Sequence, residues 1–341
     1  MSPQRRTTIA TVAVLASLPL WASDFWLANV MGQALALGLV VLSLNFLAGL
    51  GGMVSMAQMT VAGCAGYALA LTSANAVGMG QVLPPLLSLA AALAAALTAG
   101  TVIGAIAVRS AGIYLLMLTL ALGMGFFYFV QQNTAVFNAF DGISGVAAPR
   151  IAGVSVREPA LFYAICLLLS LAAYAAVRGL AQSPFGLVLQ ALRDHPAKAR
   201  ALGFDTARHR VAAFALAALP AGTGGVLYTW FNERISPSTV GLGMLNAVLI
   251  MGVIGGLGHP VGAFVGALAY VLLNTFAGEF VGVERFNTLV GMVFVFIVLA
   301  SPGGLVGLAS RWRHWRQWCR RSGPALPEPP LDSPSIHPKE T

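Results

Sequence analysis

Long apolar runs that are almost free of charge occupy most of this chain. Only 9% of the residues are Asp, Glu, Lys or Arg, whereas a soluble globular protein carries about 25%. An apolar helix of about 20 residues spans the hydrocarbon core of a bilayer, where each backbone N–H and C=O must be satisfied internally. A β-barrel would show short alternating segments instead of continuous runs. The sequence therefore predicts an all-α polytopic membrane protein.

About ten transmembrane helices are expected from these runs. They cover residues 8–22, 29–48, 53–72, 83–108, 112–130, 159–177, 211–230, 243–257, 261–276 and 287–308. The eighth and ninth runs are short and are joined by Gly258-His259-Pro260, so they form either two tilted helices or one broken hairpin. Arg5 and Arg6 precede the first run, which leaves a signal peptide cleaved at Ala22 as an alternative for that segment.

Basic residues are distributed unevenly between the connections of these spans. If the N-terminus is cytoplasmic, both termini are inside, and fifteen of the 19 Lys and Arg residues face the cytoplasm. The four on the outer side are Arg150, Arg157, Arg234 and Arg285. Cytoplasmic loops carry an excess of Lys and Arg, so we expect this orientation. The net charge of +8 thus reflects membrane topology, because nucleic-acid binding would need a basic soluble face.

No Asp, Glu, Lys or Arg lies within a predicted span. Proton and ion pumps bury such groups for their mechanism, so their absence argues against an autonomous proton-driven pump. The buried polar residues are neutral, and Asn45, Ser55, Gln58 and Thr119 are the candidates for lining a translocation path. Hydrogen bonding between helices explains such residues equally well. The glycine-rich run 49–52 is expected to be a tight turn or a helix break, a feature that builds some transporter sites.

The connection at residues 178–210 concentrates charge in a chain that otherwise avoids it. Its first half predicts a short helix, because Ser183 is a helix N-cap and Pro184 occupies the first helical position. Pro196 lacks an N–H and disfavours helical angles at the preceding residue, so this helix should end near Arg193. The charged connection is therefore expected to be folded.

The second half of the charged connection predicts another short helix, which ends near Leu202. Gly203 supplies the left-handed residue at its C-terminus. Asp205 or Thr206 then caps the next helix, which becomes the seventh span. A rigid element held by a membrane helix at each end is suited to docking with a partner, although positive-inside charge alone would explain an ordinary solvated loop.

Two regions follow from this organisation: a membrane domain at residues 1–310, and a C-terminal segment at 311–341. The segment 311–321 alternates cations with tryptophans and is expected to anchor at the membrane interface rather than bind nucleic acid. The remaining tail is rich in proline and polar residues, which predicts disorder. The three cysteines show no CxxC or paired spacing, so neither a disulfide nor a metal site is expected.

Five stretches of this chain resemble the permeases of branched-chain amino-acid ABC transporters, the LivM group. The stretches appear in family order over roughly residues 40–300: "LSLNFLAGLGGMVSMAQMTVAGCAGY", "GIYLLMLTLALGMGFFYFV", "FDGISGV", "FGLVLQALRDHPAKARALGFDTARHRVAAFALAALPAGTGGVLY" and "VLIMGVIGGLGHPVGAFVGA". In such permeases a cytoplasmic loop couples the membrane subunit to an ATPase. The resemblance implies that residues 178–210 are this coupling loop.

The resemblance further implies a heteromeric importer in the bacterial inner (cytoplasmic) membrane. Its other members would be a second, LivH-like permease, two ATP-binding subunits similar to LivG and LivF, and a periplasmic substrate-binding protein. The coupling residues it implies are Arg193, Asp194, Lys198, Ala201 and Gly203. The sequence departs from the general importer pattern of Glu-Ala-Ala, three residues and Gly, because arginine stands in the place of the acid and the glycine follows sooner.

No cofactor is expected on this chain, with ATP bound by the partner subunits. The chain has only two lysines, and neither follows a Gly-rich loop in the GxxxxGK[ST] form, so it carries no Walker A motif. An intramembrane serine protease is a weak alternative, because Ser144 in "GISG" lies on the outer side while all five histidines are assigned to the inner side. A permease for urea or short amides and a stand-alone facilitator remain the alternatives as transporters.

Overall fold

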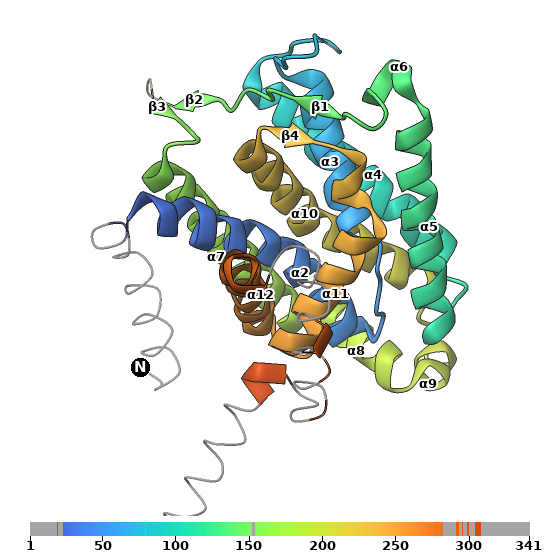
Figure 1. The fold of residues 1–341 in the computed structure, drawn as a ribbon. Coiled ribbons are helices and arrows are strands. Elements are labelled where there is room, and N and C mark those ends of the chain that lie inside the picture. Colours follow the sequence, from blue (N-terminus) through green and yellow to red (C-terminus); the bar gives the residue numbers. More distant parts are fainter. Residues whose placement is uncertain are drawn as a thin grey trace, which may run out of the picture.

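Helices make up almost the whole of the described chain (Figure 1). The computed structural model describes residues 23–281 apart from 79, 152 and 153, and elsewhere only positions 19, 291, 292, 295, 299 and 304–307. The expected span 8–22, most of the expected span 287–308 and the segment 311–341 therefore lie outside the described residues.

The helices follow the expected spans closely. A π-helical segment, Trp26–Gly32, leads into α2 (Gln33–Gly51), which is followed by α3 (Gln58–Thr72), α4 (Pro85–Ala107), α5 (Ile113–Gln132), α6 (Thr134–Phe137), α7 (Pro159–Gln182), α8 (Pro184–Asp194), α9 (Pro196–Ala201), α10 (Thr206–Asn232), the 3-10 turn η3 (Pro237–Val240), α11 (Leu242–Gly255) and α12 (Pro260–Val281). Spans two to nine of the sequence prediction each correspond to one of these helices.

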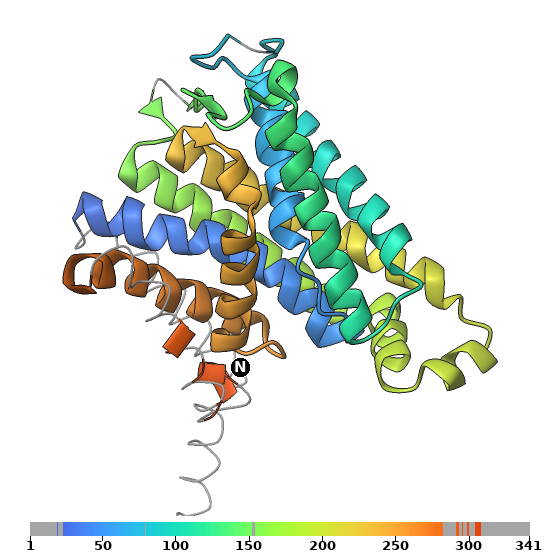
Figure 2. The same cartoon turned by 45° about the vertical axis from the view of Figure 1, so that its right-hand side comes forward.

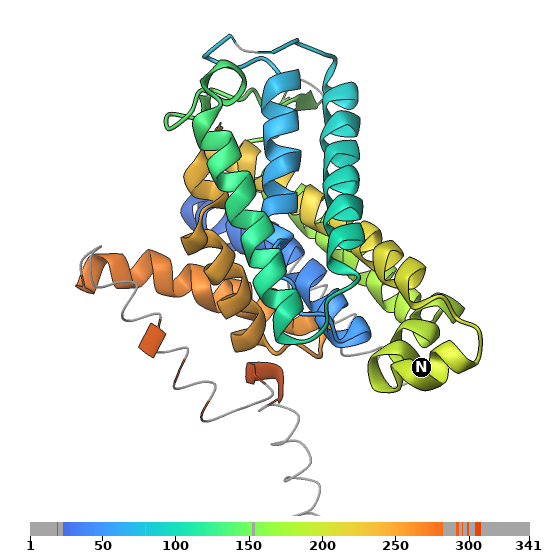
Figure 3. The ribbon, with the colours of Figure 1, turned by 90° about the vertical axis from the view of Figure 1, so that its right-hand side faces the viewer.

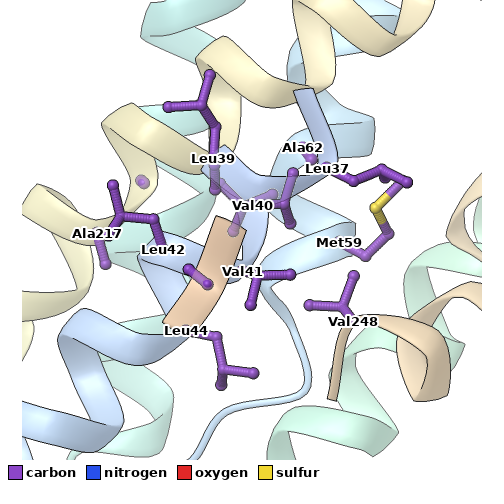
Figure 4. Close-up of a cluster of buried hydrophobic side chains, with 14 of the residues drawn as sticks. Leu37, Leu39, Val40, Val41, Leu42, Leu44, Met59, Ala62, Ala217 and Val248 are labelled. Carbon is purple, nitrogen blue, oxygen red and sulfur yellow. The ribbon is translucent and has the colours of Figure 1, made fainter. Parts of the chain in front are cut away.

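Helix α2 lies at the centre of the bundle. Its residues are apolar on every side, which is typical of a helix surrounded by protein, and Leu39, Val40 and Leu42 are completely buried. Side chains from α3, α10 and α11 close around them, among them Met59 and Val248 (Figure 4). In Figure 2, α2 and α12 lie side by side, while α3, α4 and α5 stand together on the other side of the bundle.

Close backbone contacts join α10 to its neighbours. A Cβ atom on Gly225 would lie 2.1 Å from the carbonyl oxygen of Ala62 in α3. A Cβ on Gly224 would lie 2.7 Å from the carbonyl oxygen of Ala36 in α2. Helices in a membrane associate largely through van der Waals packing, and small residues allow their backbones to approach. The glycines of α10 thus place this helix in contact with both parts of the bundle.

The residues that the structure describes do not confirm the expected count of ten membrane spans. Among the described residues, five helices are long and apolar enough to cross a membrane: Trp26–Gly51, α4, α5, α7 and α10. The pair α11 and α12 would make a sixth, but a bend of 119° separates them. The eighth and ninth expected spans are therefore two helices at a steep angle, which form a broken span or a re-entrant loop.

The expected third span, 53–72, begins later than predicted. Gly52 has a φ of 63°, so it ends α2 in the left-handed conformation. Residues 52–55 are not helical, and α3 begins only at Gln58. With 15 residues, α3 is shorter than the helix of about 20 residues that spans a bilayer. The expected break at the glycine-rich run is confirmed, and it is longer than a single turn.

The two ends of the bundle carry different structures. One end holds short strand pairs: β1 (Ile143–Ser144) is antiparallel to β4 (Arg234–Ile235), and β2 (Arg150–Ile151) is antiparallel to β3 (Val154–Ser155). The opposite end holds α8 and α9 (Figures 1 and 3). The all-α prediction missed these two-residue strands, because pairing so short leaves no alternating pattern in the sequence.

Charged side chains make contacts at both ends of the bundle. Arg157 forms a 2.9 Å ion pair with Glu233 beside the strands. At the other end, Nη1 of Arg210 lies 3.5 Å from the carbonyl oxygen of Val108. The cations assigned to the inner side that the structure describes thus gather near α8 and α9.

Replacement of Gly225 by alanine tests the packing of α10. The added methyl would overlap the backbone of Ala62, and overpacking of this kind costs about 1–3 kcal/mol. We expect Gly225→Ala to lower the midpoint of thermal unfolding of the purified chain in detergent. The control is Gly125→Ala on α5, where a Cβ would have no atom within 4 Å. Equal midpoints for the two variants would contradict this packing.

Candidate functional site

The charged loop folds as two short helices whose ends match the sequence signals. Ser183 caps α8, and its hydroxyl accepts a hydrogen bond from the N–H of Gly186 at 3.3 Å. His195 separates α8 from α9, and Gly203 ends the second helix with a φ of 89°. Asp205 caps α10, because its carboxylate accepts hydrogen bonds from the backbone N–H groups of Ala207 at 3.0 Å and Arg208 at 3.1 Å. The predicted helix–turn–helix–turn is confirmed.

Helix α8 packs on the bundle through an apolar face. Leu189 and Leu192 are buried, and Leu189 lies against the end of α2 beside Gly51. The ring of Phe185 stacks on His209 at the start of α10, with ring centroids 5.8 Å apart. These contacts hold α8 to both α2 and α10, so the loop is attached along its length rather than only at its ends.

The α9 tip, defined as residues 198–204, is the most exposed part of this loop. Lys198, Ala201 and Gly203, three of the predicted coupling residues, are all exposed there. Leu202 is 77% exposed and Phe204 is 40% exposed. Large apolar side chains exposed at a rigid tip are a feature of interaction surfaces. Prediction from sequence missed Leu202 and Phe204, although an apolar residue on each side of a left-handed glycine was the available signal.

Arg193 and Asp194, the other two predicted coupling residues, contact each other and the bundle. Nε of Arg193 donates to Oδ1 of Asp194 at 2.8 Å. Nη1 of Arg193 donates to the carbonyl oxygen of Gly49, in the last turn of α2. The hydrogen bond from Arg193 holds the pKa of the Asp194 carboxyl below its ordinary value. Arg193 is therefore engaged within the chain, whereas the α9 tip is free to meet another surface.

Two of the four candidate path residues, Ser55 and Thr119, lie at the non-helical stretch between α2 and α3. This stretch, the 52–57 segment, includes Ser55, which is buried. The hydroxyl of Thr119 on α5 accepts a hydrogen bond from the backbone N–H of Met56 at 3.1 Å. The hydroxyl of Ser55 accepts from the N–H of Ala57 at 3.3 Å. Side chains thus satisfy backbone groups that a continuous helix would have satisfied itself.

Gln58 begins α3 immediately after this segment. Its side-chain oxygen accepts a hydrogen bond from the hydroxyl of Ser43 on α2. Two residues further on, the hydroxyl of Thr60 is buried with no hydrogen-bond partner among the described residues, and it faces Gly123 of α5. The N-terminus of α3 is therefore a buried polar region between α2 and α5.

Asn45 lies apart from the other three candidates. Its side-chain nitrogen lies 3.3 Å from the carbonyl oxygen of Gly256 and 3.2 Å from that of His259. Both carbonyls belong to residues 256–259, the α11–α12 turn. The structure therefore places Asn45 as a brace for this turn, and groups only Ser55, Gln58 and Thr119 around the 52–57 segment.

Glycines bring α11 and α12 together at this turn. A Cβ on Gly255 would lie 1.8 Å from the carbonyl oxygen of Gly262, and a Cβ on Gly266 would lie 1.9 Å from that of Met251. The backbones of the two helices are thus in direct contact.

A cavity of about 540 Å³ lies on a different face of the bundle, between α7 and α10. Its lining is apolar and includes Val177, Leu216 and Pro220. None of the four candidate path residues lines it. Within residues 23–281 as described, no three His, Cys, Asp or Glu side chains are placed to hold a metal ion.

Ser144 lies at the end of the molecule away from the described histidines. It belongs to β1, in the strand pairs at one end of the bundle, while His195 and His209 lie just before and after α9, at the opposite end (Figure 1). A nucleophilic serine needs a base within hydrogen-bond reach. None of the histidines that the structure describes meets this requirement for Ser144.

Replacement of Thr119 by valine tests its part in closing the helix break. Valine has nearly the same shape but cannot accept the hydrogen bond of Met56, and an unsatisfied buried N–H costs about 1–3 kcal/mol. We expect Thr119→Val to lower the thermal midpoint of the purified chain, while Thr119→Ser preserves it. A valine variant as stable as the wild type would show that this hydrogen bond does not support the 52–57 segment.

Similarity to known proteins agrees with this arrangement. Residues 26–299 match the family described as "Branched-chain amino acid transport system / permease component". The chain is 25% identical over 289 residues to the high-affinity branched-chain amino acid transport system permease protein LivM of Escherichia coli K12, covering 78% of this chain and 66% of that protein. The LivM protein of Salmonella typhimurium is 26% identical over the same lengths.

A more distant organism also has a similar protein. The probable branched-chain amino acid transport permease protein LivM of Methanocaldococcus jannaschii is 26% identical over 184 residues, half of this chain and 53% of that protein. The chain spans 66% of the length of the two bacterial LivM proteins that it matches. No solved structure is significantly similar to it. The family match covers most of the chain, including every helix from α2 to α12. The chain therefore belongs to the permease component family of branched-chain amino acid transport systems.

Proposed function

We propose that this chain is a membrane subunit of an ATP-driven importer for branched-chain or related amino acids. In this proposal it forms half of a translocation path, with a second permease as the other half. Two ATPase subunits bind it from the cytoplasm, and a periplasmic binding protein delivers the substrate. Residues 178–210 are the coupling loop in this proposal, and the excess of basic residues around it supports a cytoplasmic location for that loop and for both termini.

The observation that carries this proposal is the exposed α9 tip. It is rigid, because a capped helix leads into it and another leaves it. It combines cations such as Lys198 and Arg200 with an exposed apolar residue, Leu202. It also lies at the end of the bundle where the inner cations gather (Figure 3). A surface of this composition fits a protein groove, because apolar area favours association while charge sets its orientation.

The break between α2 and α3 supports the transport part of the proposal. Unwound segments and half-helix ends within the membrane are tolerated where protein buries them or where they line a cavity, and transporters place substrate sites there. Ser55, Gln58 and Thr119 surround such a break. They are closed off by the chain's own helices in this conformation, so a substrate would reach them only after α2, α3 or α5 moves.

Reconstitution in liposomes tests the proposed function. The chain would be assembled with a second permease of the LivH type, two ATPase subunits and a periplasmic binding protein. We expect concentrative uptake that requires ATP and loaded binding protein, and a panel of leucine, valine, phenylalanine and urea would identify the substrate class. Concentration of solute by the chain alone, without nucleotide, would contradict the proposal.

Replacement of Leu202 by serine tests docking at the α9 tip. Full burial of a leucine side chain contributes about 1.5–3 kcal/mol, so its loss should weaken binding of the ATPase subunits by roughly 10- to 100-fold. The measurement is the affinity of purified ATPase subunits for the permease pair in nanodiscs. Leu86→Ser is the matched control. Leu86 is 79% exposed, but it lies in the first turn of α4, at the opposite end of the bundle from the α9 tip. Equal losses in the two variants would rule out docking at the tip.

A further inference from the structure

The C-terminal end of α2 is a junction of three separate parts of the chain. Helix α8, the 52–57 segment and the α11–α12 turn all contact its last two turns. The last carbonyl groups of a helix have no partner within it and must find one elsewhere. At this end of α2 the donors are Arg193 of α8 and the backbone N–H groups of Gly52 and Met53, so α8 and the 52–57 segment are both attached there.

Arg193 is the link from α8. Its guanidinium donates to the carbonyl oxygen of Gly49 in the last turn of α2, where a cation is also favoured by the negative end of the helix dipole. A Cβ on Gly52 would lie 2.5 Å from Cγ of Arg193, so the stem of this side chain lies against the residue at which α2 ends. Arg193 therefore contacts α2 and the beginning of the 52–57 segment at once.

The α11–α12 turn meets the same end of α2 from another side. Asn45, one turn before Gly49, donates to two carbonyl groups of this turn. A Cβ on Gly49 would lie 3.2 Å from the carbonyl oxygen of Leu257. Gly304 packs on the turn as well, since its own Cβ would lie 2.5 Å from the nitrogen of Gly256. The turn is thus held against α2 by side-chain hydrogen bonds and by direct backbone contact.

The third link runs through the 52–57 segment to the buried polar region. Met56 donates to Thr119 on α5, and Gln58 accepts from Ser43 on α2. Any displacement of the end of α2 therefore acts on the groups that surround the helix break. Short, rigid contacts of this kind transmit a movement because packed elements shift as units rather than deform continuously.

We propose that Arg193 is a positioning residue that ties the coupling loop to the end of α2, so that α8, the 52–57 segment and the α11–α12 turn move together. This inference rests on the proposed function, in which an ATPase displaces the loop. The resemblance to known permeases implied that Arg193 contacts the ATPase. In this inference Arg193 instead connects elements inside the permease. The α9 tip receives the movement, and Arg193 passes it to α2.

The geometry favours the internal role. Arg193 already uses Nε for Asp194 and Nη1 for Gly49, and the planar guanidinium fork can serve both acceptors at once. An arginine that served only the partner would have no reason to reach the end of α2, 144 residues earlier in the chain. Lys198 and Leu202, in contrast, project from the tip with no such contact to α2.

The experiment compares Arg193→Gln, Arg193→Lys and the control Arg208→Gln in the complete reconstituted complex. Arg208 is in the same loop but its side chain is 89% exposed and pairs only with Asp205. Three quantities are measured for each variant: recovery of ATPase subunits with the permease, ATP hydrolysis stimulated by loaded binding protein, and solute transported per ATP hydrolysed. The first reports assembly, and the last reports coupling.

We expect Arg193→Gln to assemble normally but to transport at least tenfold less solute per ATP hydrolysed. Arg193→Lys should show an intermediate loss of about two- to fivefold, because lysine restores the charge and one hydrogen bond but not the fork. Arg208→Gln should match the wild type. Rescue by lysine with unchanged assembly is a result that a purely structural defect would not produce.

Two results would overturn this inference. Loss of the ATPase subunits from Arg193→Gln would show that Arg193 contacts the partner directly, and unchanged coupling would show that the tie transmits nothing. If Arg193→Gln does not fold, Arg193→Lys decides: an intermediate loss supports the tie, and wild-type coupling contradicts it. Failure of the proposed function would appear already in the wild-type complex, as the absence of ATP-dependent uptake.

Discussion

Direct contact between helix backbones is the constraint on which this structure depends. In lipid no hydrophobic driving force brings apolar helices together, so their association depends strongly on packing and on the few hydrogen bonds between them. Glycines at positions such as 225, 255 and 266 permit distances at which a Cβ would overlap a neighbouring carbonyl group. They allow α2 to be enclosed by its neighbours, and the enclosed helix in turn provides the fixed end to which the charged loop and the α11–α12 turn are attached.

Most of the helical organisation could be predicted from the sequence, for identifiable reasons. Apolar runs report burial in lipid or protein directly, and capping residues such as Ser183, Gly203 and Asp205 mark helix ends within a residue or two. Both signals are local. The fold of the charged loop was predictable because all the information for its turns lies within about 30 residues.

The candidate sites were predictable only in part, because their chemistry depends on contacts between distant segments. Polar residues within the spans could be identified, but the sequence does not show that Asn45 reaches the α11–α12 turn while Thr119 reaches Met56. The sequence also does not show that Arg193 contacts α2, because its acceptor, a backbone carbonyl of that helix, leaves no signal in composition or spacing. The third span was predicted to be continuous for a similar reason, since its unwound backbone is stabilised by a side chain from another helix.

The exposed leucine at the α9 tip has a consequence for the subunit before it is assembled. In the proposed assembly an ATPase covers this position, so the unassembled permease would present an apolar side chain to water on the side where chaperones and proteases act. Exposed apolar surface of this kind promotes aggregation and recognition by quality-control machinery. On the proposed orientation, an orphan copy would be marked for removal by the same residue that recruits its motor, so the stoichiometry of the importer would be enforced by degradation as well as by synthesis.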